Sequence, residues 1–343
     1  MIPITFKQKN IFKMFVSVAL IIFSLVLFSG SALLDDPKSK LADAEKYYNA
    51  AQFDDAINIL VELSNDNTID KEIQKDALRF LGRAYTAKGL YENAKDAITK
   101  LLKLEPPMVV FNPDYEPPVF MKLYYESRKN ITGSYTLERE DPGMKNLAVI
   151  DFKNRSITER EQYDPMEKGF ADLLINRLNN STNLRVVERE RIQWILDEIK
   201  LQNEYEMEGA VRLGKQLGVQ SVLMGSFIVT GDEIWLGARL VKVETSEILL
   251  TDEIRGDLEE FFDLVDQLSN KISEKINVTL NDLTPEQEAN APSLDAIMSY
   301  SIGLSYLEKE DYKMAFEKFQ EALRYDPGYE KAKLKAQSIA PLQ

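Results

Sequence analysis

The sequence predicts an α+β protein in which a central mixed sheet with packed helices is flanked by all-α helical hairpins. Two observations lead to this fold class. Residues 38–130 and 293–338 place apolar residues at helical spacing, in segments that resemble one another. From Asn146 onward, short β-branched runs alternate with amphipathic helical segments. Elements that alternate in this way pack as a sheet covered by helices.

Composition limits the chemistry that the chain can perform. The 343 residues suffice for two or three domains, and 44% of them are hydrophobic. The chain has no His and no Cys, which removes the usual acid–base group, thiolate nucleophiles, disulfides and the commonest metal ligands. Its 42 Lys and Arg face 56 Asp and Glu, a net charge of −14 that repels a phosphate backbone. We therefore expect no catalytic residue, no cofactor, no metal and no nucleic-acid partner.

Residues 1–32 have the organisation of a signal peptide. Three lysines precede an uncharged stretch that begins at Met14, and small residues follow it up to Ala32. Cleavage between Ala32 and Leu33 would release the rest of the chain. Alternatively, residues 14–34 are long enough to remain as an uncleaved membrane anchor. Both interpretations place the remainder outside the cytoplasm.

A helical-hairpin pattern follows in residues 38–130. In "ALRFLGRAYTAKGLYENAKDAITKLLKLEPP", Gly82 and Ala94 are small where two helices would cross, and Pro106 ends the second helix. The preceding segment repeats the pattern, and a third copy occupies residues 293–338, with a solvating helix at its end. These offsets resemble the tetratricopeptide repeat. Pro117-Pro118 then predicts a further helix that covers the last repeat with Phe120, Leu123 and Tyr124.

The resemblance implies a partner-binding groove, because tetratricopeptide repeats bind peptides or proteins along their first helices. The alternative for each residue on these faces is a solvated helix surface. The candidate partner-binding residues are Glu45, Tyr48, Asn49, Arg79, Arg83 and Thr86.

The middle domain is expected over residues 146–278, joined to its neighbours by linkers at 131–145 and 279–292. It should contain a hairpin that turns at Gly231-Asp232 and a helix that Gly218 ends. The expected strands are 146–152, 184–189, 221–230, 233–243 and 247–256, and the expected helices are 165–180, 190–202, 208–218 and 258–276.

The order of these segments resembles the CsgG family, which includes the curli-secretion channel and LpoB-type envelope proteins. The segments "LAVIDF", "KGFADLLINRL", "LRVVERERIQWILDEIKLQ" and "AVRLGKQLGVQSVLMGSF" carry the resemblance. It implies a role in the cell envelope in protein binding or assembly, not a reaction. Family members that form pores have a lipidated N-terminal Cys and long extra hairpins, and this chain has neither. We therefore do not expect a self-sufficient pore.

The run "VVERER" joins a strand to a helix. Negative charge at Glu188 and Glu190 is favourable near a helix N-terminus. Arg189 and Arg191 are expected to point outward at the sheet edge. Neighbouring side chains on a strand diverge, so this run indicates a structural join or a partner surface rather than an active site. Trp194 and Trp235 are expected in the core.

Taken together, the sequence predicts a non-enzymatic exported protein of the periplasm or cell envelope. We expect it to bind other envelope proteins or peptides through its repeat groove and its CsgG-like domain, as a scaffold or regulator. One alternative is a component of a curli-type secretion assembly at the outer membrane. A second is a carboxylate-dependent hydrolase, which would need convergent acidic side chains.

Overall fold

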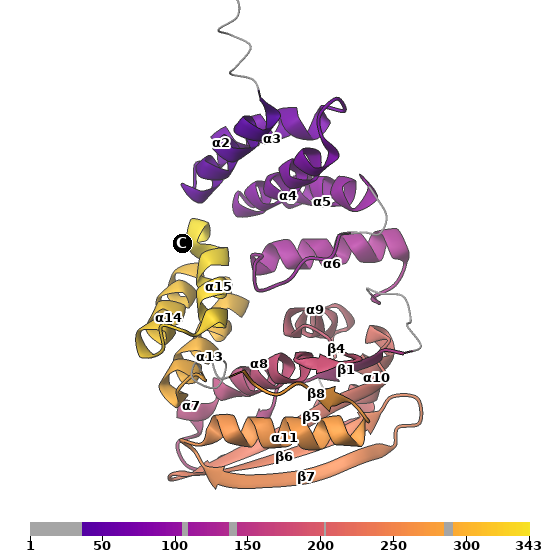
Figure 1. The fold of residues 1–343 in the computed structure, drawn as a ribbon, viewed down its shortest axis with the longest axis vertical. Coiled ribbons are helices and arrows are strands. Elements are labelled where there is room, and N and C mark those ends of the chain that lie inside the picture. The colour runs from indigo at the N-terminus through magenta and orange to yellow at the C-terminus, as the bar shows by residue number, and fades with distance from the viewer. Residues whose placement is uncertain (1–35, 105–108, 137–142, 202–203, 285–290) are drawn as a thin grey trace, which may run out of the picture. The chain divides into compact units, whose positions relative to one another are not determined.

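The computed structural model describes residues 36–104, 109–136, 143–201, 204–284 and 291–343 (Figure 1). The chain forms two compact units, one ending at Ala84 and one beginning at Tyr85. The predicted signal peptide or anchor, with its cleavage site between Ala32 and Leu33, lies outside the described residues. None of the helices in the described ranges combines the length and apolar character that crossing a membrane requires.

The first unit is built of helical hairpins, as predicted. Helix α2 (Pro37–Asn49) begins at the N-cap Asp36, packs against α3 (Phe53–Asn65), and is followed by α4 (Lys71–Ala87). The ring of Tyr48 lies between those of Phe53 and Phe80, with centroid distances of 5.7 and 5.8 Å. Aromatic packing of this kind holds the hairpin together.

The second unit begins with two further helices. Helix α5 (Tyr91–Leu104) packs against α6 (Pro118–Thr132), which starts at the predicted proline and ends at Gly133 in a left-handed conformation with φ of 70°. Phe120, Leu123 and Tyr124 are buried, which confirms the predicted covering helix.

The sheet of the second unit is mixed. Its order is β4 (Leu184–Val186), β1 (Lys145–Val149), β5 (Ser221–Thr230), β6 (Glu233–Lys242) and β7 (Ile248–Asp257). Strand β1 runs parallel to β4 and β5, whereas β5, β6 and β7 are antiparallel. The hairpin turns at Gly231-Asp232, with Gly231 at φ 59°, as predicted.

Short strands complete the β-structure. Strand β2 (Lys153–Asn154) pairs with β5 in parallel. Strands β3 (Ser181–Thr182) and β8 (Thr279–Leu280) form a separate antiparallel pair.

Helices α8 (Met166–Asn179) and α11 (Phe261–Lys275) cover one face of this sheet, with the short α7 (Arg160–Tyr163) before α8 (Figure 1). The core between them is aromatic: the ring of Phe170 lies 4.9 Å from that of Phe227 and 4.3 Å from that of Phe261. Burying such side chains supplies most of the free energy that favours folding.

Helix α10 (Met207–Leu217) packs on the opposite face, next to α9 (Arg189–Ile199). Gly218 ends α10 with φ of 71°, as predicted. Gly214 of α10 packs against Val222 and Val243, so α10 covers only one end of the strands β5 and β6. Farther along, the outward face stays open, and Trp235 is 44% exposed. The prediction that Trp235 lies in the core was therefore wrong, whereas Trp194, 6% exposed, is buried as predicted.

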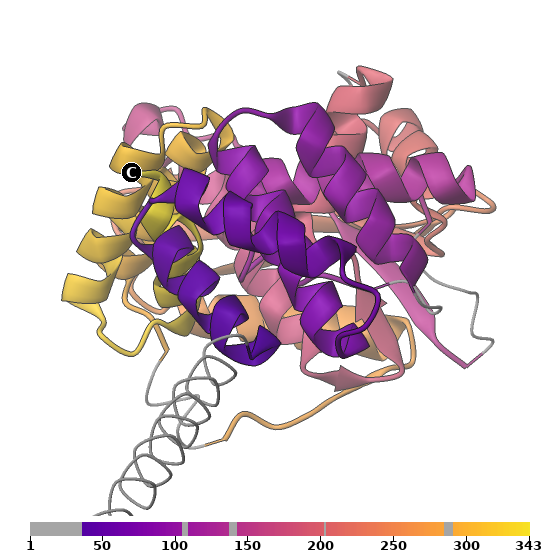
Figure 2. The same cartoon turned by 90° about the horizontal axis from the view of Figure 1, so that it is seen from above.

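The C-terminal repeat consists of α13 (Leu294–Glu308), α14 (Tyr312–Tyr325) and α15 (Glu330–Ile339), followed by the 3-10 turn η1 (Ala340–Leu342). The neighbouring helices pack in sequence, and α14 and α15 lie side by side in both views (Figure 1, Figure 2). Gly303 lies where a Cβ atom would come within 2.6 Å of the Phe319 ring, which explains the small residue. The predicted fold class, a mixed sheet with packed helices flanked by helical hairpins, is thus confirmed.

Candidate functional site

The join between β4 and α9 buries charge instead of exposing it. Arg189 is 4% exposed; its Nε donates to Oδ1 of Asp151 at 2.8 Å and an η nitrogen donates to Oδ2 at 2.7 Å. Arg191 is 6% exposed and donates to the carbonyl of Tyr135 at 2.6 Å. The prediction that both arginines point outward was wrong.

The topology explains this arrangement. Strands β1 and β4 are parallel neighbours, so their carboxyl ends meet at one edge of the sheet. Asp151 follows β1, and Arg189 begins the helix that follows β4 with only two residues between. Opposite charges are thereby brought together in bidentate geometry, the strongest form of carboxylate–guanidinium contact.

The C-terminal repeat completes this ionic cluster. The same η nitrogen of Arg189 donates to Oε1 of Glu308, at the end of α13, at 2.6 Å. Glu308 also pairs with Lys168 of α8. A chain of alternating charges, Asp151–Arg189–Glu308–Lys168, therefore links the sheet, two helices of the middle domain and the C-terminal repeat.

A second ionic cluster surrounds Lys335 of α15. Its side chain is 2% exposed, and Nζ donates to Glu190 at 2.5 Å and to the carbonyl of Pro113 at 3.1 Å. Asp114 lies 3.3 Å from the same nitrogen. The C-terminal helix α15, which was predicted to face solvent, thus has a side that is buried against the rest of the second unit.

A neighbouring contact joins α15 to α8. Lys331 Nζ lies 2.8 Å from Asp172, and the hydroxyl of Tyr300 donates to the same carboxylate at 3.1 Å. The two clusters together with this contact are called the ionic junction below. It joins the middle domain to the C-terminal repeat within the second unit.

The electrostatics of the ionic junction favour the charged forms. Burial is the largest influence on the Glu190 carboxyl and by itself would raise its pKa, but the charge and hydrogen bond of Lys335 together with the charge of Arg189 outweigh it and lower that pKa. In the same way Arg189 and Lys168 lower the pKa of Glu308, and Lys335 and Lys331 lower the pKa of Asp114. All three carboxylates are therefore ionised at neutral pH, and they stabilise the folded state.

Acid should weaken the ionic junction. Because the folded pKa values of Asp114, Glu190 and Glu308 lie below their unfolded values of 3.8, 4.5 and 4.5, their contribution is fully present above about pH 5. It is lost as the pH falls through the lowered folded values. We expect the thermal midpoint to be insensitive to these groups between about pH 7 and 5 and to drop at lower pH, as a pH series would show. A drop that began near neutral pH would contradict the assignment.

A groove of about 310 Å³ lies beside the ionic junction. Its walls come from α6, α9 and α13, and it is called the junction groove below. The ring of Tyr125 stacks on that of Trp194 at 5.4 Å along one wall, while Leu304 and Leu307 of the C-terminal repeat line another. Asp197 and Glu310 add negative charge and Lys122 adds one positive charge. An apolar floor with a charged rim is suited to binding part of another protein.

The predicted partner-binding residues do not share one exposed surface: some are exposed and others are buried. Tyr48 is 3% exposed and packs in the core of the first unit, whereas Glu45 and Asn49 on the same helix are exposed. Arg79 and Arg83 are partly buried on α4, with the Arg83 guanidinium carbon 5.1 Å from the centre of the Phe80 ring. Thr86, near the end of α4, is 7% exposed.

Sequence reasoning missed the ionic junction and the junction groove. Two signals could have indicated the former: an Asp directly after a buried strand, and the Lys331–Lys335 spacing that puts two lysines on one helix face. In the described part of the chain, no group of three or more acidic side chains is placed to hold a metal ion.

Comparisons with known proteins agree with this architecture. Residues 135–230 match the family described as curli production assembly/transport component CsgG. Residues 77–107 and 296–329 match the tetratricopeptide repeat. No curated protein sequence matches the chain.

Several solved structures are similar to part of the chain. The C-terminal domain of LpoB from Salmonella enterica is 18% identical, with a TM-score of 0.29, covering 40% of this chain and 95% of that one. The lipoprotein GNA1162 from Neisseria meningitidis is 16% identical, with a TM-score of 0.28, covering 40% of this chain and 99% of that one. PelC from Paraburkholderia phytofirmans, a dodecamer, is 13% identical, with a TM-score of 0.25, covering 42% of this chain and 94% of that one.

The family matches follow the same order along the chain as the observed elements: helical hairpins, mixed sheet, helical hairpin. This protein therefore carries a CsgG-like domain flanked by tetratricopeptide repeats.

Proposed function

We propose that this protein is a non-enzymatic scaffold of the bacterial cell envelope, which binds other envelope proteins. The observation that carries the proposal is the ionic junction. It couples a CsgG-like domain to a tetratricopeptide repeat through buried charges, with Arg189 and Lys335 at its two centres. Repeats of this kind bind proteins, and a rigid attachment keeps the binding surface ordered before the partner arrives.

Two surfaces are proposed to receive partners. The first is the junction groove, where the partly exposed Pro118 and Val119 supply apolar contact area. The second is the face of α4 that carries Arg79 and Arg83, one helical turn apart. Arginines so placed can hold acidic or C-terminal carboxylates by charge-assisted hydrogen bonds. Tyr48 supports this region from the core rather than by contact with the partner.

The envelope location rests on the N-terminal segment and on the family. Residues 1–32 have the organisation of a signal peptide, and the matched family is described as a curli assembly and transport component. The mature chain is proposed to begin at Leu33 in the periplasm, and residues 14–34 would anchor it if cleavage does not occur.

The test is partner capture with the mature chain in its native envelope. Changing Arg79 and Arg83 together to Ala should reduce the capture of partners and its salt sensitivity, with each lost charge-assisted bond worth roughly 1.5–3 kcal/mol. The matched control changes Lys100 and Lys103, both exposed on α5, to Ala and removes the same charge. Crosslinking followed by mass spectrometry measures the captured proteins.

Three outcomes distinguish the surfaces. If the control loses capture equally, the effect is one of net charge and the α4 face is not used. If the arginine variant folds and captures every partner normally, the α4 face is not used. If neither that variant nor a Val119→Asp variant, which changes a partly exposed wall residue of the junction groove, loses any partner, both proposed surfaces are excluded and the scaffold proposal fails.

A further inference from the structure

The outward face of β5, β6 and β7 is a second surface with its own chemistry. Strand register places Ser226 opposite Gly237 and Gly237 opposite Glu253, while Ile228, Trp235 and Arg255 form the next outward row. Ile228 is 38% and Trp235 44% exposed. This surface, together with Lys153 and Arg155 beside it, is called the open face below.

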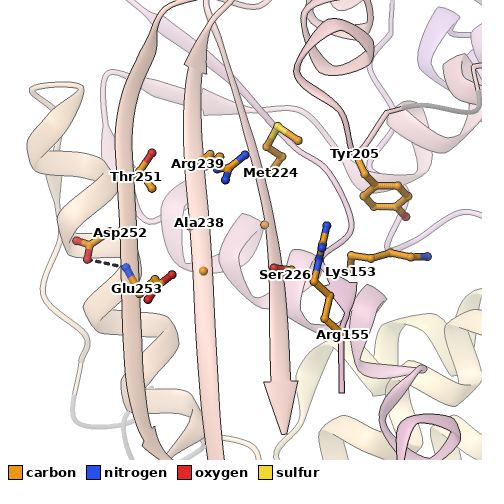
Figure 3. Close-up of a pocket in the computed structure, with 12 residues that line it drawn as sticks. Lys153, Arg155, Tyr205, Met224, Ser226, Ala238, Arg239, Thr251, Asp252 and Glu253 are labelled. Atoms are coloured by element: carbon orange, nitrogen blue, oxygen red, sulfur yellow. Dashed lines mark hydrogen bonds between the residues drawn. The ribbon is translucent and has the colours of Figure 1, made fainter. Parts of the chain in front are cut away.

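A hollow of about 230 Å³ lies in the open face. Figure 3 shows Arg239 extending from β6 toward β5, and Arg155 on the other side of β5 beside Ser226. Gly237 contributes to the floor: a Cβ atom there would meet nothing closer than 3.8 Å, so the missing side chain leaves space above the backbone. The side chains of Arg155 and Arg239 thus lie at the sides of the hollow, and the backbone of β6 at Gly237 forms part of its floor.

The positive charge in this hollow is not neutralised. Among the described residues, neither Arg155 nor Arg239 has an ion-pair partner. Lys153 has only a long contact of 3.6 Å with Glu167 and lies 4.9 Å from the centre of the Tyr205 ring. Of the two acidic residues on the rim, Asp252 is held by Lys271 at 2.9 Å. Within the described residues, the two arginines that lack an ion-pair partner therefore face one carboxylate that lacks one, that of Glu253, in a chain of net charge −14.

The composition of the open face indicates which anion would bind. Arginine, tryptophan and tyrosine are the residues enriched where proteins bind proteins. An extended anionic surface, such as a bilayer, would be repelled by the net negative charge of the whole molecule. A short acidic segment would meet only the local positive hollow, with the exposed Trp235 and Ile228 beside it for an apolar side chain.

We propose that the open face binds an acidic segment of a partner protein, with a carboxylate between Arg155 and Arg239 and an apolar residue against Trp235 and Ile228. The proposal goes beyond the junction groove and the α4 face, because it concerns a different surface and does not require either of them.

The test measures binding of two short synthetic peptides to the purified mature chain by fluorescence anisotropy. One alternates leucine with glutamate, and the other alternates leucine with glutamine. The glutamate peptide should bind more tightly, and added salt should weaken it. Changing Arg155 and Arg239 to Gln should weaken it by roughly tenfold for each arginine. The control variant, Arg212→Gln with Lys215→Gln, removes the same charge from the exposed side of α10 and should bind normally.

A second variant tests the hollow itself. Gly237→Val keeps every charge, suits a strand and fills space that the backbone leaves open. It should keep the thermal midpoint and lose the preference for the glutamate peptide. Equal binding of both peptides, no binding of either, or equal loss in the α10 control would overturn the proposal. Binding to anionic phospholipid vesicles that depended on the same arginines, without peptide binding, would identify a membrane contact and overturn it too.

Discussion

Replacing Arg189 by Met should destabilise the second unit by roughly 3–5 kcal/mol, because it removes the positive charge at the centre of the ionic junction. Asp151 and Glu308 would then lose a partner held at 2.7 and 2.6 Å. The side chain of Asp151 is 8% exposed, so water cannot replace the guanidinium. The measurement is urea unfolding followed by circular dichroism, combined with hydrogen exchange at α9 and α13, because a chain of two units need not unfold in one step.

A matched control lies on strand β7. Arg255 pairs with Glu233 and lies 4.7 Å from the centre of the Trp235 ring, but both partners of the ion pair are more than half exposed. Arg255→Met should cost about 1 kcal/mol or less. A double variant, Arg189→Met with Asp151→Asn, should recover part of the loss, because the orphaned buried charge is gone. Equal losses in Arg189→Met and Arg255→Met would show that burial of the ionic junction has no energetic consequence.

The sequence predicted the elements of this fold because their signals are local. Helical spacing, the proline at the start of α6, the Gly231-Asp232 turn and the small residue at Gly303 each act within one element or hairpin. The helix after "VVERER" was predicted for the same reason.

The ionic junction could not be predicted in this way. The two partners of Arg189 lie 38 and 119 residues away along the chain, and Glu190 and Lys335 are 145 residues apart. Whether a charge is buried depends on which distant element covers it, and a local pattern does not contain that information. Trp235 was predicted wrongly for a related reason. The alternating pattern of its strand indicates that one face is buried, but helices α8 and α11 cover the face of the sheet opposite to the one that carries Trp235.

Replacing Lys335 by Met should lower the free energy of unfolding by a similar amount. The stability of this variant should change with pH in the opposite direction to that of the original chain. The ammonium group is 2% exposed, and Met has nearly the same length without the charge. Glu190 and Asp114 would be left facing each other in a buried site, at a cost of roughly 3–5 kcal/mol at neutral pH. Hydrogen exchange should show the loss first in α15 and in the contact of α9 with the C-terminal repeat.

The sign of the pH effect follows from the pKa of Glu190. With Lys335 present, that pKa lies below 4.5, so the original chain loses stability as acid protonates the carboxylate. Without Lys335, burial and the neighbouring Asp114, which raise the pKa, outweigh the smaller lowering by Arg189, and the pKa rises above its unfolded value. The variant then gains stability as the pH falls through this raised value. The difference in unfolding free energy between the two proteins should therefore shrink from about pH 7 to pH 4, as parallel urea titrations would show. A difference that stayed constant over this range would mean that Lys335 stabilises the fold by packing alone.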